Sequence, residues 1–432
     1  MDPIAVGIVG MAVFLLLLVV GVPVGVAMTL VGLGGFAWLV SWEAAVGKAA
    51  LIPFTTVTDY NFAVVPAFIL MAQIFSVTGM GSRLYDFCEK WIGFMRGGLA
   101  MATIFAAAIF SAISSSTIAT VVTIGAIAIP EMMRRRYDPG FAGATVAAAG
   151  GLGILIPPSS ILILYGLMTE QSIRELFRAG IVPGVALAAA YAIAVAIICR
   201  MRPTYAAAGV RYSMKEKWKA LLGVWETILL ILLTLGGLFS GWFTPTEAGA
   251  VGASGAMFIG LARRKLTFPG LMQALKATTA SSGMVALILI GGFLFNYFVA
   301  VTGMTEALIE AVESLKVPAT VAMLVVTLAY LVLGTFMDSL AMLLLTIPFM
   351  FPFVQSLGYD PIWFGVYAVM VMEMANLSPP VGLNVFVLSG LVRDMPLEAI
   401  FRRVTPFVLA QLAVTLLMIY FPEFVTFVNH RP

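Results

Sequence analysis

Long apolar stretches separated by short polar segments run through the whole chain. The segments 4–20 and 284–301, for example, contain no charged side chain. A helix of about 20 such residues crosses a hydrocarbon core of about 30 Å. We therefore predict about ten transmembrane helices, at about 3–20, 23–40, 62–80, 142–168, 182–199, 225–242, 246–262, 283–303, 362–391 and 404–425.

Two further apolar stretches, 97–130 and 319–352, have an intermediate length. Each spans about 34 residues, which is too long for one helix and too short for two full crossings with a loop. A re-entrant hairpin, which enters and leaves the membrane on one side, fits this length. The predicted fold class is thus an all-α integral membrane protein with about ten transmembrane helices and two re-entrant hairpins.

The two halves of the chain carry the same markers in the same order and at a nearly constant offset. The matched pairs are Val-Thr-Gly-Met at 77–80 and 301–304, Tyr-Asp-Pro at 137–139 and 359–361, Pro-Pro at 157–158 and 379–380, and a polar break at 114–116 and 338–339. Repetition of this kind in an apolar chain is typical of secondary transporters. We predict a first repeat at 1–200, a linker at 201–221 and a second repeat at 222–432. Because each repeat crosses the membrane five times, the second copy is expected to be inverted.

The distribution of cationic side chains predicts the orientation in the membrane. Only 10% of the residues are charged, against roughly 25% in soluble domains. On the predicted topology, one face holds 19 of the 24 Lys and Arg residues, in 81–96, 131–138, 200–219, 263–276 and 392–403. The positive-inside rule makes this face cytoplasmic. Both termini are then expected on the outer face.

Two short segments beside predicted crossings are amphipathic. In 81–96, and again in 305–316, apolar residues recur at helical spacing opposite charged ones. We predict that both segments lie at the membrane surface. There they either brace one moving part against another or serve only as surface helices. The linker 201–221 is the most basic and polar stretch of the chain.

The double prolines interrupt two predicted crossings. Pro157-Pro158 lies inside 142–168 and Pro379-Pro380 inside 362–391. A proline removes a backbone donor and displaces a carbonyl about one turn earlier, so each pair frees carbonyl oxygens that a desolvated Na⁺ could use as ligands. The half-helix that starts after each break directs its N-terminal amides inward, and such an end attracts an anion. A kink with packing value alone is the alternative for either pair.

Polar side chains also gather at the predicted hairpin tips. Ser111 to Thr117 contains five hydroxyls, and Asp338 with Ser339 lies at the matching place of the second hairpin. Hydroxyl, carbonyl and carboxylate oxygens suit an alkali cation rather than zinc or copper. Asp338 and Glu373 are functional candidates because an ionisable group at membrane depth is costly, although Glu373 could instead pair within the scaffold. Two further carboxylates near span ends, Glu226 and Glu247, are expected to be solvated.

The residues around these breaks resemble those of one known family. The runs 151–159 (Gly-Leu-Gly-Ile-Leu-Ile-Pro-Pro-Ser), 336–339 (Phe-Met-Asp-Ser) and 377–384 (Leu-Ser-Pro-Pro-Val-Gly-Leu-Asn) closely resemble the large membrane subunit of tripartite ATP-independent periplasmic (TRAP) transporters. The resemblance extends over essentially the whole chain. It departs at the first hairpin tip, where the family commonly has a Gly and often an acidic residue a few positions on. This chain has Ser115 and Thr120 there.

The resemblance implies a mechanism and partners. In the implied elevator mechanism, a mobile domain of 97–168 plus 319–391 slides against a scaffold made of the remaining spans. The family resemblance also implies Na⁺ as the coupling ion, a small four-helix membrane subunit and a soluble periplasmic substrate-binding protein. It places the protein in a bacterial inner membrane, in contact with lipid and with both termini periplasmic. No organic cofactor and no nucleic-acid partner is expected.

Matching the family motifs residue by residue implies two cation sites and one substrate site. The first cation site would use Ser114, Ser115 and Ser116 with the backbone near Gly153 and Pro158. The second would use Gly334, Thr335, Asp338, Asn376, Ser378 and Pro379. The substrate would lie between the hairpin tips, near Ser159, Ser339, Val381 and Gly382.

The sequence therefore predicts Na⁺-coupled uptake of a small organic anion, a carboxylate or sulfonate delivered by a periplasmic binding protein. A stand-alone Na⁺/dicarboxylate carrier that needs no binding protein is the alternative. A channel is disfavoured because two capped hairpins suit occlusion better than a continuous pore. An enzyme is disfavoured because the sole histidine, His430, lies at the extreme C-terminus and the sequence offers no catalytic constellation.

Overall fold

The computed structural model describes residues 2–206, 209–335, 337–392 and 395–427, and these residues form helices joined by short loops, without a strand. Phe336 and His430, which were named in the sequence analysis, lie outside the described residues. The first half contains α1 (Pro3–Val19), α2 (Val24–Leu39), α3 (Trp42–Thr58), the 3₁₀ helix η1 (Tyr60–Ala63), α4 (Val64–Val77), α5 (Met80–Ile92), α6 (Gly98–Ser114), α7 (Thr117–Arg134), α8 (Pro139–Gly150), α9 (Leu152–Leu155), α10 (Ser160–Thr169) and α11 (Ile173–Met201).

The second half begins after the linker helix α12 (Met214–Gly223). It contains α13 (Trp225–Ile231), the π-helical turn η2 (Leu232–Gly236), α14 (Gly237–Phe239), α15 (Pro245–Ala262), α16 (Phe268–Thr302), α17 (Met304–Ser314), α18 (Ala319–Leu333), α19 (Ser339–Ser356), α20 (Pro361–Leu377), α21 (Leu383–Leu391), α22 (Leu397–Tyr420) and α23 (Glu423–Thr426).

The helix order of the first half recurs in the second half at the spacing of the sequence markers. α5 and α17 each start after a glycine with φ of +68°, Gly79 and Gly303. α7 and α19 each start at a side-chain cap, Ser116 and Asp338, which accepts a hydrogen bond of 3.3 Å from the amide three residues on. The two halves therefore share these local features, and Ser116 and Asp338 hold matching positions as caps.

The predicted hairpins and broken helices correspond to observed helix pairs. α6 and α7 pack on each other and are joined at Ser115-Ser116, whereas α18 and α19 are joined across 334–338 and each packs on α20. The predicted crossing 142–168 consists of α8, α9 and α10, and the crossing 362–391 consists of α20 and α21. Each break falls at a double proline, as the loss of backbone donors there predicts.

The count of crossings differs from the prediction of about ten. Seven of the described helices are long and apolar enough to span a membrane, or eight if the bent pair of α12 with α13–α14 counts as one. α1 and α2, predicted as crossings, have only 17 and 16 residues. α7 and α19, predicted as halves of hairpins, have 18 residues each and pass the same test. Length and composition alone therefore do not separate crossings from hairpin helices in this chain.

The sequence analysis assigned two segments wrongly. The stretch 41–61 contains α3, which was not predicted as a helix. The stretch 263–276, predicted as a cytoplasmic loop, is a loop only to Thr267, because α16 then continues for 35 residues. Polar side chains such as Gln273 and Lys276 occur on the exposed side of this helix, so they do not interrupt it.

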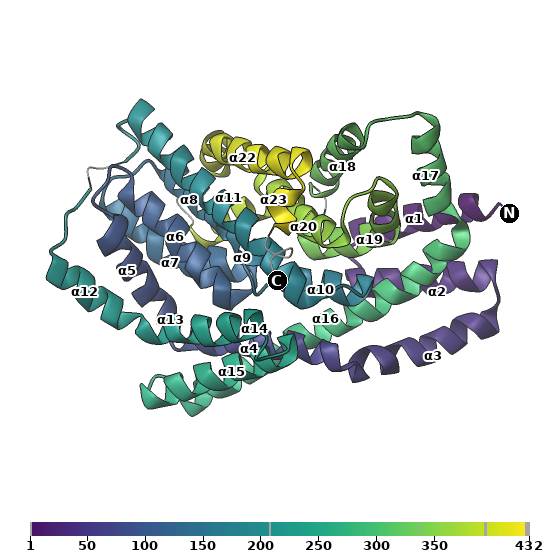
Figure 1. Ribbon diagram of the computed structural model, residues 1–432, viewed down its shortest axis with the longest axis horizontal. Coiled ribbons are helices and arrows are strands. Elements are labelled where there is room, and N and C mark those ends of the chain that lie inside the picture. Colours follow the sequence, from purple (N-terminus) through teal and green to yellow (C-terminus); the bar gives the residue numbers. More distant parts are fainter. Residues whose placement is uncertain (1, 207–208, 336, 393–394, 428–432) are drawn as a thin grey trace.

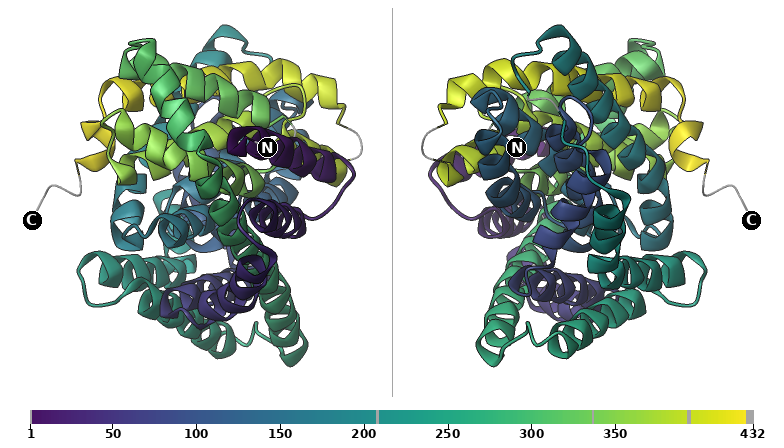
Figure 2. Two further views of the ribbon diagram at one scale, coloured as in Figure 1. Left: turned by 90° about the vertical axis from the view of Figure 1, so that its right-hand side faces the viewer. Right: turned by 90° about the vertical axis from the view of Figure 1, so that its left-hand side faces the viewer.

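The helices pack in two groups (Figure 1). One group contains α1 to α4 and α13 to α16, in which α2 packs along α16 and α4 along α15. The other contains the two helix pairs, the broken helices, α11 and α22. Seen end-on, α22 and α15 lie at opposite edges of the molecule (Figure 2). α11 and α22 pack on α6, α8 and α20 and so lie with the hairpins, whereas the sequence analysis left 182–199 and 404–425 with the scaffold.

The linker docks on the amphipathic helix α5. The Tyr212 hydroxyl donates to Glu89 at 2.5 Å, and the Trp91 indole N–H donates to the Lys217 carbonyl at 3.3 Å. The helix α12 itself starts with a capping box, in which hydrogen bonds from Ser213 lower the pKa of the Glu216 carboxyl. α5 also packs against α6 and α7, so it braces the linker against the first hairpin.

The environment of the Glu226 carboxylate also differs from the prediction. It was predicted to be solvated, yet it is buried and forms an ion pair with Arg263. The pairing explains the burial, because an unpaired charge would be expensive to remove from water. Glu247, by contrast, is exposed and accepts a hydrogen bond of 2.8 Å from the Thr244 amide at the start of α15.

Candidate substrate and cation site

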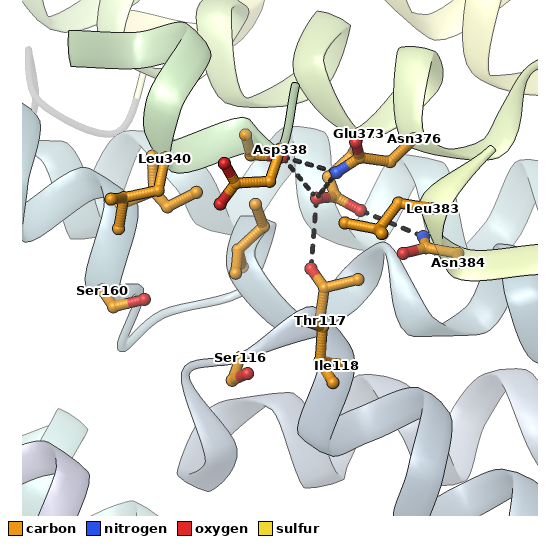
Figure 3. Close-up of a pocket in the computed structure, with 13 residues that line it drawn as sticks. Ser116, Thr117, Ile118, Ser160, Asp338, Leu340, Glu373, Asn376, Leu383 and Asn384 are labelled. Carbon is orange, nitrogen blue, oxygen red and sulfur yellow. Dashed lines mark hydrogen bonds between the residues drawn. The ribbon is translucent and has the colours of Figure 1, made fainter. Parts of the chain in front are cut away.

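A polar pocket of about 120 Å³ lies where the hairpin tips meet the broken helices (Figure 3). Four helices begin at its wall, because the first residues of α7, α10, α19 and α21 all line it. The lining residues are Ser116, Thr117, Ile118, Ile154, Ser160, Ile161, Asp338, Ser339, Leu340, Glu373, Asn376, Leu383 and Asn384. Helix N-termini carry partial positive charge and free amides, so the backbone of this pocket favours an anion.

Side-chain caps fix three of these helix starts. Ser116 accepts from the Ala119 amide, Ser159 from the Leu162 amide and Asp338 from the Ala341 amide, at 3.2 to 3.3 Å. Such caps satisfy one orphan donor each and set the direction in which the helix leaves the pocket.

Glu373 lies at the centre of the hydrogen bonds around the pocket (Figure 3). The Thr117 and Ser339 hydroxyls each donate to its Oε1 at 3.1 Å. The Asn376 amide donates to Oε1 at 3.1 Å, and the Asn384 amide donates to Oε2 at 3.4 Å. These donors come from α7, α19 and both halves of the second broken helix, so one carboxylate joins four structural elements.

Three buried oxygens at the site lack a hydrogen-bond partner. They are Ser115 Oγ, Asn376 Oδ1 and Asn384 Oδ1, in side chains that are 3%, 2% and 1% exposed. A buried polar atom left unpaired costs about 1–3 kcal/mol. Oxygens of hydroxyl and amide groups are hard ligands of the kind an alkali cation takes. The residues present therefore fit a bound Na⁺.

The charged residues of the pocket also suit a bound cation. Asp338 and Glu373 are its two acidic residues, and no lysine or arginine occurs among the thirteen described residues that line it. An organic anion placed there would meet two carboxylates. A bound cation would reduce the repulsion between these like charges.

Four of the predicted site residues line this pocket: Ser116, Asp338, Ser339 and Asn376. Four others pack directly behind it. Ser114 shares a 2.9 Å hydrogen bond with Thr120, and the Ser115 carbonyl accepts from Ser160 at 2.7 Å. A Cβ at Gly153 would lie 2.7 Å from the Ser116 carbonyl oxygen, and Ser159 is fully buried at the start of α10.

Other predicted residues lie outside the pocket wall. The Thr335 hydroxyl donates to the Val332 carbonyl and the Ser378 hydroxyl to the Met374 carbonyl, at 2.7 and 2.6 Å, so both are turned back on their own chain. The further predicted positions outside the wall are Pro158 and Gly334, which are buried, Pro379 and Val381, which are exposed, and Gly382, which has φ of +57° before α21.

Among the lining residues that the sequence analysis did not assign to the site are three polar ones, Thr117, Ser160 and Asn384. Thr117 is the repeat partner of Ser339, because each is the first residue of its helix, α7 or α19. Ser160 and Asn384 likewise lie in the first turn of the matching helices α10 and α21. Extending the repeat alignment by its offset of 222 residues could have found Thr117 from Ser339 and Ser160 from Gly382, whereas Asn384 matches Leu162 and could not be found this way. Glu373 was noted as a candidate without a role, because most of its donors come from distant segments.

A multi-pass, all-helical membrane protein whose helices break around a shared polar pocket has the organisation of a secondary transporter. Comparison with known families gives a specific match. Residues 11–424 match the DctM component of the tripartite ATP-independent periplasmic transporters. The chain belongs to this family, and it is the large permease component of a TRAP transporter.

Individual relatives agree with the family match. The chain is 35% identical over 381 residues to a C4-dicarboxylate TRAP transporter large permease of Pseudomonas aeruginosa, covering 88% of each chain. It is 32% identical over 409 residues to a sialic acid TRAP transporter large permease of Vibrio cholerae, covering 94% of this chain and 95% of the relative. The fold is also similar to the crystal structure of the Alcanivorax borkumensis YdaH transporter, with a TM-score of 0.61, 15% identity and coverage of 84% and 86%.

Proposed function

We propose that the protein takes up a small organic anion, a carboxylate or sulfonate, by Na⁺-coupled secondary active transport. One observation carries the proposal: the pocket combines four helix N-termini with two carboxylates and buried, unpaired oxygens. The helix starts suit the anionic group, and the oxygens suit the cations. Because each ligand lowers the electrostatic cost of the other, their affinities are coupled.

The proposed partners follow the family. The relatives are named for C4-dicarboxylate and for sialic acid, which both carry carboxylates, and this supports an organic anion of the proposed class. We propose that a periplasmic binding protein delivers it and that a small four-helix membrane subunit completes the complex in a bacterial inner membrane, with the termini periplasmic. Membership of a tripartite family favours this over a stand-alone Na⁺/dicarboxylate carrier, which would transport without a binding protein.

We further propose an elevator movement of inverted repeats. The helices around the pocket form one packed group, and α1 to α4 with α13 to α16 form another. α5, α12 and α17 connect the groups in the chain. In this mechanism, the pocket moves with the hairpins while the other group stays fixed. α11 and α22 would move as well, because they pack on α6, α8 and α20.

Transport in proteoliposomes tests the function. The chain, its small subunit and its binding protein would be supplied with a labelled C4-dicarboxylate or with sialic acid. We expect accumulation with an inward Na⁺ gradient and none with choline, since each Na⁺ entering across 100 mV contributes about 2.3 kcal/mol. Equal accumulation in both media would contradict Na⁺ coupling. Uptake that does not need the binding protein would favour the stand-alone carrier.

The charge of Asp338 should matter for cation binding. Asn caps a helix about as well as Asp, so Asp338→Asn should keep the start of α19 while removing the charge. A hydrogen bond or contact to a charged group contributes about 1.5–3 kcal/mol, so we expect the Na⁺ concentration for half-maximal uptake to rise about tenfold or more. Asp338→Asn could instead show the Na⁺ dependence of the wild-type protein, while Asp338→Ala loses stability. That result would mean that Asp338 serves only as a helix cap.

A further inference from the structure

The two asparagines beside Glu373 have orientations that their hydrogen bonds dictate. The Asn376 amide nitrogen donates to Ser339 Oγ at 2.6 Å and to Glu373 Oε1 at 3.1 Å. The Asn384 amide nitrogen donates to the Ala147 carbonyl and to Glu373 Oε2, both at 3.4 Å. Each amide thus uses both of its hydrogens. Turning either amide over would bring its oxygen against the carboxylate.

As a result, the oxygens of both amides are directed away from Glu373. These are two of the buried oxygens without a hydrogen-bond partner, and the side chains of Asn376 and Asn384 are only 2% and 1% exposed. An amide group whose nitrogen is fully used and whose oxygen is free presents only an acceptor. Two buried acceptors beside a carboxylate are suited to a cation and not to a further hydrogen-bond acceptor.

We infer that Glu373 is a positioning residue for cation binding, which holds the amides of Asn376 and Asn384 so that their oxygens face Na⁺. The inference rests on the proposed Na⁺ coupling and adds Asn384 to the ligands. In metal sites, a carboxylate that does not touch the metal commonly hydrogen-bonds to a ligand and fixes the orientation of that ligand. Glu373 does so for two ligands at once. It also accepts from Thr117 and Ser339, so the starts of α7 and α19 are held in the same arrangement.

The substitution Glu373→Gln separates this role from packing. It keeps the size of the side chain and one acceptor oxygen. Oε1 accepts three hydrogen bonds and Oε2 accepts one, so the introduced amide nitrogen should take the Oε2 position. There it faces the Asn384 amide nitrogen, so the hydrogen bond that holds Asn384 at Glu373 is lost and the Asn384 oxygen is no longer held in place. That oxygen would then be lost to the cation.

Thermal unfolding of the purified protein, titrated with NaCl at constant ionic strength against KCl, measures cation binding without a substrate. We expect Na⁺ to stabilise the wild-type protein. Without Na⁺, Glu373→Gln should unfold near the wild-type temperature. It should then need about tenfold more Na⁺ for the same stabilisation, the low end of the effect of losing an orienting partner. Asn384→Leu should raise the requirement similarly, and the double variant no further than either single one.

The outcomes separate the inference from the proposed function. A wild-type Na⁺ requirement in Glu373→Gln, or effects of the two substitutions that multiply, would overturn the positioning role. If Glu373→Gln does not fold, Asn384→Leu decides by itself, and an unchanged Na⁺ requirement overturns the inference. If the wild-type protein is not stabilised by Na⁺ over K⁺, the proposed coupling fails and the inference fails with it.

Discussion

Replacing Gly32 with leucine should leave almost no folded protein. Gly32 faces α16 where the two helices approach backbone to backbone, and a Cβ there would lie 2.7 Å from Leu294 C and Phe295 N. Neither atom can move without moving the helix. Small residues permit such close crossings in membranes, where apolar side chains gain little by leaving lipid. Extra methylene groups in a well-packed core cost about 1–3 kcal/mol. A whole leucine side chain adds a larger volume, so its cost should be higher.

The matched control lies two residues further along the same helix. A Cβ at Gly34 would meet nothing within 4 Å, so Gly34→Leu should be tolerated and should favour the helix by roughly 0.5–1 kcal/mol. Size-exclusion chromatography of detergent extracts measures the folded fraction of each variant. We expect the folded fraction of the Gly32 variant to fall at least tenfold, because the loss should exceed the stability of the native state, which is about 5–15 kcal/mol, and we expect the Gly34 variant to match wild type. Equal yields would contradict the close crossing.

The apolar pattern predicted most helices, and its errors have a physical cause. α3 was missed because Glu43, Lys48 and a run of threonines lower its hydrophobicity. The matching stretch of the second repeat falls on the first half of α16, which is equally polar and was taken in part for a loop. A single-crossing hydropathy criterion rejects both. Their length and direction depend on packing between α3, α2 and α16, which the local sequence does not contain.

The sequence predicted the location of the pocket better than it predicted which residues line the pocket. Double prolines and hydroxyl-rich tips must face a wet or protein-lined space wherever they occur in a membrane. The residue type does not decide which hydroxyl faces that space, because Ser and Thr side chains can instead hydrogen-bond to the backbone of their own helix. Thr335 and Ser378 do so, whereas Ser116 and Ser339 line the pocket.

Glu373 shows the limit of sequence reasoning most clearly. Its position inside an apolar helix marks it as unusual. Its hydrogen bonds involve donors such as Thr117, which lies 256 residues away in the chain. Folding brings these residues together, and no local pattern around Glu373 records them.

Cysteines at Ser115 and Ser339 should react with thiol reagents from opposite sides of the membrane. Both positions are buried in this structure, at 3% and 5% exposure, so reactivity requires a hairpin to open. If the repeats are inverted, exchanging their conformations converts an inward-open state into an outward-open one. The first hairpin would then open to the cytoplasm and the second to the periplasm. We expect Ser115→Cys to react with a cytoplasmic reagent in the inward-open state only.

Ser339→Cys should react with an external reagent in the outward-open state only. The native Cys88 and Cys199 would first be removed, and each single-cysteine variant would be compared with the cysteine-free protein. Membrane-impermeant reagents, applied to right-side-out and inside-out vesicles with and without a Na⁺ gradient, give the side and the state. Reaction of both cysteines from the same side under every condition would contradict the inverted hairpins. The elevator movement would fail with them, because it requires the pocket to face each side in turn.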